Sequence, residues 1–201
     1  MRPFFIVLEG IDGSGKATQA GLVGSKIFKK QPVLLTREPT GISPASTRVQ
    51  KILLEKESYM TDKEEFLKLF VEDRKFHIEK IIEPALSAGL LVICERYKYS
   101  TFAYQMTQGV SFETIEKLHQ GMMIPDLTII LDLDPVVAIQ RLEKEKRITE
   151  TFERKDFLEK VRQQYLQIPK RFPRERIIII NADDSPENVR EKIYDEFSKL
   201  Q

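Results

Sequence analysis

The chain has 201 residues, of which 41% are hydrophobic and 31% are charged, and its formal net charge is +1. A dedicated nucleic-acid-binding protein would carry a strong basic excess, so this balance argues against that class. The apolar runs are too short for a membrane helix, which needs about 20 residues. The single cysteine, Cys94, favours a reducing compartment such as the cytoplasm. We expect one globular domain over residues 1–201.

Short apolar runs of strand length alternate with longer segments of helical period along the chain. The predicted strands are 4–8, 33–36, 90–94, 127–131 and 177–180. The predicted helices are 16–29, 46–56, 62–87, 112–121, 135–145, 156–168 and 186–199. The strand runs are almost continuously apolar, which is typical of parallel strands covered on both faces. The pattern predicts a three-layer α/β fold with right-handed crossovers.

A glycine-rich turn joins the first predicted strand to the first predicted helix. Its sequence, Gly10-Ile11-Asp12-Gly13-Ser14-Gly15-Lys16, stands where a phosphate-binding P-loop requires it. Glycines let backbone N–H groups point at a phosphate, and the helix N-terminus adds positive potential. Lys16 supplies a mobile cation. We therefore predict that the P-loop, residues 10–17, binds the phosphates of a nucleotide.

The P-loop departs from its usual pattern at one position. The residue after the lysine is usually Ser or Thr, whose hydroxyl binds Mg²⁺, but here it is Ala17. The next hydroxyl belongs to Thr18, which points about 100° away around the helix. A Mg²⁺ ion is therefore expected to depend on water, phosphate oxygens and nearby carboxylates.

The P-loop is one of several motifs that follow one another along the chain. They are the stretches 8–16, 36–41, 70–74 with His77, 95–97 with Ser100, 103–105, 125–127 and 131–133. In these stretches the chain resembles the thymidylate kinase family of P-loop nucleoside monophosphate kinases. This ordered set is more specific than the P-loop alone. The resemblance implies a P-loop nucleotide kinase fold, with a five-stranded parallel sheet flanked by helices and a lid. It also implies a homodimer and the phosphorylation of dTMP to dTDP by ATP with Mg²⁺.

The resemblance places the acceptor site around the predicted helix 62–87. Phe70 would stack on the thymine ring, and Arg74, one turn further along, would donate to thymine O4, where cytosine has an amino donor instead. Arg37 and Arg96 resemble the arginines that contact the acceptor phosphate. The other residues of this pocket would be Asp12 near the sugar, Tyr104 against the deoxyribose, and Pro39, Ser100 and Gln105.

The lid is where the resemblance is weakest. Family members either carry a catalytic arginine in the P-loop or supply it from the lid, and Gly13 places this chain in the second group. Relatives of that group often have Asp-Arg-Phe-Glu in the lid, whereas residues 150–153 here are Glu-Thr-Phe-Glu. We therefore assign the catalytic lid cation to Arg147, within a lid at about 143–154. Arg141 enters the lid on a helix and is assigned to catalysis and ATP binding.

Two carboxylates are assigned to the metal. Asp12 matches a family carboxylate that lies near the metal and the acceptor. Glu95 replaces the family's usual aspartate, and its longer side chain would help to compensate for Ala17.

Two other functions stay open. Phe70 and Arg74 would also accept uracil, so the acceptor could be another pyrimidine monophosphate such as dUMP. Ala17 and the altered lid also suit a nucleotide-binding protein with little kinase activity. The two histidines, His77 and His119, lack ligand-spaced partners, and we assign them to packing or to the surface.

Overall fold

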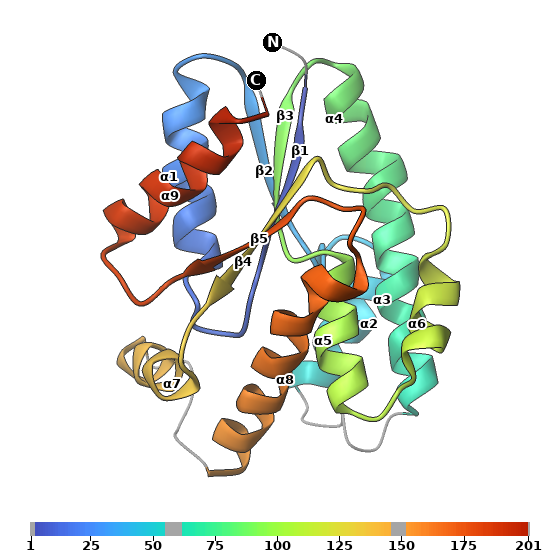
Figure 1. Ribbon diagram of the computed structural model, residues 1–201. Coiled ribbons are helices and arrows are strands. Elements are labelled where there is room, and N and C mark those ends of the chain that lie inside the picture. The colour runs from blue at the N-terminus through green and yellow to red at the C-terminus, as the bar shows by residue number, and fades with distance from the viewer. Residues whose placement is uncertain (1–2, 55–61, 146–151, 201) are drawn as a thin grey trace.

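The computed structural model describes residues 3–54, 62–145 and 152–200. A parallel sheet lies between two groups of helices (Figure 1). Its strands are β1 (Phe5–Glu9), β2 (Val33–Arg37), β3 (Leu91–Glu95), β4 (Leu127–Asp132) and β5 (Ile177–Asn181), in the spatial order β2-β3-β1-β4-β5. Every neighbouring pair is parallel. The predicted three-layer α/β fold with a five-stranded parallel sheet is therefore confirmed.

Helices cover both faces of the sheet. On one face lie α1 (Lys16–Phe28) and α9 (Pro186–Ser198), as Figure 1 shows. The other helical elements are α2 (Pro44–Leu54), α3 (Lys63–His77), the π-helix η2 (Ile78–Ile82), α4 (Glu83–Ser87), α5 (Lys98–Thr107), α6 (Phe112–His119), α7 (Pro135–Lys144) and α8 (Phe152–Arg171). The predicted helix 62–87 is thus one continuous helical stretch over 63–87, with a π-helical segment in its middle. None of the helices in the described part of the chain has the length and apolar character that crossing a membrane requires.

The sequence pattern does not predict α5, the helix that follows β3. Tyr97, at its N-cap, makes no side-chain cap hydrogen bond. Instead, Oε1 of Glu9 in β1 accepts the backbone N–H groups of Tyr97 at 2.9 Å and Ser100 at 3.1 Å. The first N–H groups of a helix have no partner within it, and a negative charge there is favourable. A carboxylate distant in the sequence therefore caps α5, which local sequence does not show.

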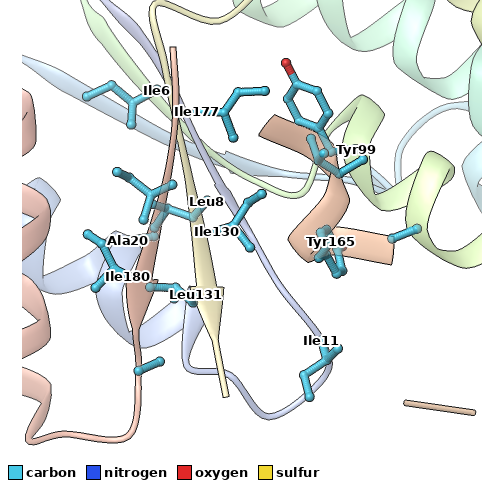
Figure 2. Packing of buried hydrophobic residues seen from close by; sticks show 14 of the residues in the cluster. Ile6, Leu8, Ile11, Ala20, Tyr99, Ile130, Leu131, Tyr165, Ile177 and Ile180 are labelled. Carbon is cyan, nitrogen blue, oxygen red and sulfur yellow. The ribbon is translucent and has the colours of Figure 1, made fainter. Parts of the chain in front are cut away.

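The core holds the C-terminal ends of the strands in fixed positions. Figure 2 shows Ile6 and Leu8 of β1, Ile130 of β4 and Ile180 of β5 in the packed core with Ala20 of α1. All five side chains of β1 are buried. Because the strands are parallel, the loops after β1, β2 and β3 emerge at one edge of the sheet. That edge carries the P-loop and the segments that begin at Glu38 and Arg96.

Candidate active site

The P-loop leaves the C-terminal end of β1 and leads into α1. Gly10, Gly13 and Gly15 have φ angles of 139°, 81° and 92°, which L side chains rarely adopt. A Cβ at Gly10 would also lie only 2.6 Å from the carbonyl oxygen of Leu131. Glycine is therefore required at Gly10 by both its φ angle and the close approach of β4, and at Gly15 by its φ angle alone.

Gly13 lies directly against α7. A Cβ at this position would lie 2.5 Å from the carbonyl oxygen of Ala138. We expect Gly13→Ala to lower the free energy of unfolding by about 1–3 kcal/mol, because the added carbon is overpacked and the residue has a left-handed φ. The control is Gly21→Ala, within α1, where the Cβ position is open. It should raise that free energy by about 0.5–1 kcal/mol. Urea unfolding measures both; unchanged stability in Gly13→Ala would mean that α7 moves away readily.

The Lys16 ammonium is folded back onto the loop that carries it. Its Nζ donates to the carbonyl oxygens of Gly10 at 3.0 Å and Ile11 at 2.8 Å, and the side chain is buried. Burial, and then the positive charge of Arg96, lower the pKa of Lys16 to about 7. The carbonyl dipoles are weak partners for a buried cation, so the oxygens of a phosphate would bind this ammonium in preference.

Arg96 lies at the centre of the site. Its φ of 67° is in the left-handed region, which costs a residue with a side chain about 1–2 kcal/mol. Nη2 donates to Oδ1 of Asp12 at 2.6 Å, and Nη1 donates to Oγ of Ser100 at 3.0 Å and to the Gly10 carbonyl oxygen at 3.3 Å. Strained residues are concentrated at functional sites. Asp12, Lys16, Arg96 and Ser100, which the sequence distributes over three segments, are thus brought together beside the P-loop.

Two tyrosines and a buried carboxylate surround the Arg96 guanidinium. The hydroxyl oxygens of Tyr104 and Tyr165 each lie 3.4 Å from it. Burial raises the pKa of Tyr104 to about 12. Tyr165, on α8, also donates to Oε2 of Glu9 at 3.0 Å, and burial raises the pKa of that carboxyl. Sequence analysis missed Glu9 and Tyr165. Glu9 could have been found, because an acidic residue at the end of an apolar strand is unusual, whereas no sequence pattern points to Tyr165.

A groove of about 370 Å³ runs beside the start of α1. It is lined by Ala17, Ala20, Gly21, Leu35, Thr36, Arg37, Thr40, Ile42, Ile81 and Glu95. Ala17, Thr18 and Arg37 are exposed to solvent. The carboxylates of Asp12 and Glu95 lie near enough to Lys16 that their negative charges act to raise its pKa. In the parts of the chain that are described, no group of three or more His, Cys, Asp or Glu side chains could hold a metal ion.

The predicted base-binding residues form a separate group on α3. Phe70 is half-buried, with its ring centroid 4.9 Å from that of Phe66. Arg74 is 1% exposed, and its Nε donates to Oε2 of Glu38 at 2.8 Å. A base can therefore contact Arg74 only if neighbouring side chains move. Both histidines are buried, and His77 contacts Glu38 through Nδ1 at 3.0 Å, so the surface alternative for them is excluded.

The remaining predicted residues lie around these groups. Pro39 follows a cis peptide bond. Gln105 is buried, and its backbone carbonyl oxygen accepts the Val110 N–H at 3.0 Å. Nη2 of Arg141 donates to the carbonyl oxygen of Ala182 at 3.2 Å and so joins α7 to the loop after β5. Arg147 and the centre of the predicted lid lie outside the described residues.

A P-loop at the C-terminal edge of a parallel sheet ordered β2-β3-β1-β4-β5 defines a P-loop nucleotide kinase fold.

The family model described as Thymidylate kinase matches residues 8–193. A probable thymidylate kinase of Pyrococcus horikoshii is 41% identical over 198 residues, which cover 96% of this chain and 95% of the relative. One of Pyrococcus abyssi is 40% identical over 199 residues, with the same coverage. A thymidylate kinase of Halothermothrix orenii is 35% identical over 208 residues, 96% of each chain. The chain belongs to the thymidylate kinase family.

Proposed function

We infer that the protein transfers the γ-phosphoryl group of ATP to dTMP, giving dTDP and ADP. The observation that carries this inference is the Arg96 guanidinium, held between Asp12 and Ser100 beside the P-loop. Phosphoryl transfer is catalysed mainly by positioning and by cations around the transferred group. Membership of the thymidylate kinase family supports dTMP as the acceptor.

The P-loop side of the site binds ATP in this proposal. Backbone N–H groups of residues 10–18 surround the phosphates, and Lys16 leaves the carbonyl oxygens of Gly10 and Ile11 to contact them. Arg141 frames the nucleotide from α7, where its guanidinium already reaches the loop after β5.

The acceptor lies on the opposite side of Arg96. Its phosphate is held between Arg96 and the exposed Arg37, whose forks suit phosphate oxygens. The sugar and the base are bound by the remaining acceptor residues, which are Asp12, Ser100, Tyr104, Gln105, Pro39, Phe70 and Arg74.

Mg²⁺ enters with ATP as part of the substrate. The donor set suits this ion, because the carboxylates of Asp12 and Glu95 are hard oxygen ligands beside Lys16. Two carboxylates without a hydroxyl at Ala17 leave most of the coordination to phosphate oxygens and water. When bound, the ion neutralises charge on the phosphates.

The lid, the assembly and the compartment complete the proposal. Arg147 is the lid cation for the transferred phosphoryl group, and residues 143–154 form the lid. The protein is a homodimer, as the resemblance implies. It works in the cytoplasm, a compartment that suits the buried free thiol of Cys94.

The test of this function is ATP turnover coupled to each of several acceptors. We expect ADP release to require an acceptor and kcat/KM to be highest with dTMP. A preference for dUMP would identify the alternative acceptor. No turnover with any pyrimidine monophosphate, together with tight ATP binding, would identify a nucleotide-binding protein instead.

Arg74→Lys tests whether Arg74 recognises the base of the acceptor. Lysine keeps a cation as a partner for the buried carboxylate of Glu38, but it loses the planar fork. We expect the preference for dTMP over dCMP to fall by about 1–3 kcal/mol, as for loss of a base-edge contact. The exposed neighbour Lys75 provides the control, Lys75→Arg, which should leave the preference unchanged. An unchanged dTMP:dCMP ratio of kcat/KM in Arg74→Lys would rule out this role.

A further inference from the structure

The Arg74 guanidinium is held by three side chains from different segments. Nε and Nη2 lie 2.8 Å and 2.7 Å from Oε2 of Glu38, in the loop after β2. Nη1 donates to Oγ1 of Thr101 on α5 at 3.1 Å and also contacts Nε2 of His119, the last residue of α6. Nη1 carries two protons, and Thr101 and His119 take both. Nη2 also carries two protons, of which one faces Oε2 of Glu38, so one N–H of Nη2 remains for a ligand.

The tautomer of His119 follows from its other ring nitrogen. Nδ1 lies 2.7 Å from the carbonyl oxygen of Ile115, one turn earlier on α6. A carbonyl oxygen can only accept, so Nδ1 carries the proton and Nε2 presents a lone pair to Arg74. The ring is also packed against Phe102, with centroids 5.6 Å apart. His119 is thus oriented as a neutral hydrogen-bond acceptor.

The charges that face His119 keep it neutral. Burial is the main cause that lowers its pKa to about 3, and Arg74, Lys98 and Lys75 lower it further. The bond from Nδ1 to Ile115 opposes this shift and is outweighed. A protonated imidazole would place a second cation against Arg74, whereas a neutral one orients Nη1 without neutralising the guanidinium. Because Glu38 already pairs with the positive charge of Arg74, the neutral imidazole leaves the remaining N–H of Nη2 to an acceptor oxygen on the base.

We propose that His119 is a specificity-determining positioning residue, which fixes the Arg74 guanidinium so that Nη2 faces the base carbonyl of the acceptor. This inference rests on the proposed function, in which Arg74 reads the base. His119 acts through Arg74 and does not itself touch the substrate. The ligand class that it selects is a pyrimidine with a carbonyl oxygen, and not an amino group, at position 4.

The kinetic test compares His119→Gln with His119→Leu. Glutamine offers an amide oxygen in place of the Nε2 lone pair and should keep the dTMP:dCMP ratio of kcat/KM close to that of the wild type. Leucine removes the acceptor and should lower this ratio about tenfold, within the range of one base-edge contact. The KM for ATP should not change in either variant. Phe197→Leu, at a buried core residue of α9, is the control for loss of packing alone and should leave the ratio unchanged.

The outcomes separate the inference from the function on which it rests. If Arg74→Lys leaves the ratio unchanged, Arg74 does not read the base and the proposed function is wrong on this point. If Arg74→Lys lowers the ratio and His119→Leu does not, only the role of His119 is overturned.

A spectroscopic test needs no variant to be active. The ¹⁵N shifts of the wild-type imidazoles should show His119 neutral, with its proton on Nδ1, from about pH 5 to about pH 8, where an ordinary histidine titrates. The chain has two histidines, so His119→Gln assigns the signals. Titration of His119 in this range, or a proton on Nε2, would overturn the proposal even if His119→Leu fails to fold.

Discussion

Replacing Lys16 by methionine is expected to remove most phosphoryl transfer and, at the same time, to stabilise the ligand-free protein. The turnover number should fall by about a hundredfold to a thousandfold, the usual effect of removing one preorganised donor to a developing charge. The fold should tolerate the change, because the ammonium contacts carbonyl oxygens of its own loop and methionine is apolar and flexible. A coupled assay at saturating ATP and dTMP measures the first effect.

The second effect has a defined pH dependence. Burial lowers the pKa of Lys16 in the folded protein from 10.5 to about 7, so the unfolded chain binds more protons between these values. The free energy of unfolding that is due to this group therefore rises with pH across that window. Lys16→Met should exceed the wild type by on the order of 4 kcal/mol near pH 7, and the difference should shrink as the pH approaches 10. A difference that is constant with pH in urea titrations would show that burial does not penalise this ammonium.

Arg96 variants are expected to have a comparably large effect on activity and a separate effect on stability. The guanidinium holds Asp12 and Ser100 beside the P-loop, and in the proposed reaction it also binds the acceptor phosphate. Arg96→Ala should lower kcat/KM for dTMP by about a hundredfold to a thousandfold. Arg96→Lys, which keeps the charge and loses the fork, should lie between alanine and the wild type.

Arg96→Gly distinguishes the effect of the backbone strain at residue 96 from the effect of losing the guanidinium. Glycine and alanine both lack the guanidinium, so the two variants should be equally inactive. Glycine alone adopts a φ of 67° without strain, and its free energy of unfolding should be about 1 kcal/mol higher than that of alanine. Equal stabilities would mean that the left-handed conformation is relaxed once the guanidinium is removed. Activity near the wild type in either variant would contradict the central position of Arg96.

The sheet and the P-loop can be predicted from the sequence because both depend on local patterns. Continuous apolar runs mark all five strands to within about one residue of their ends, well inside the usual error for element boundaries. By contrast, α5 is not predicted, because its N-terminus is capped by Glu9 from a strand some ninety residues away. The helix that carries Ser100, Tyr104 and Gln105 thus depends on a tertiary contact.

The site residues that belong to a sequence motif could be predicted, whereas the burial of a side chain could not. The sequence placed Asp12, Lys16 and Arg96 in one site, and the structure brings their side chains together. It did not indicate that Arg74 is buried against Glu38, or that His119 contacts it, because burial depends on how α3, α5 and α6 pack. The roles of these residues toward a substrate stay predictions.

The contact between Gly13 and Ala138 has a consequence for how this protein can evolve. The resemblance to the family implies two catalytic arrangements, one with an arginine in the P-loop and one with an arginine in the lid. In this chain an arginine at position 13 would have to displace the backbone of α7, because even a Cβ would lie 2.5 Å from the Ala138 carbonyl oxygen. A switch between the two catalytic arrangements would therefore have to pass through a shift of a whole helix. A single mutation of Gly13 to arginine would therefore destabilise the protein before any gain in activity could be selected.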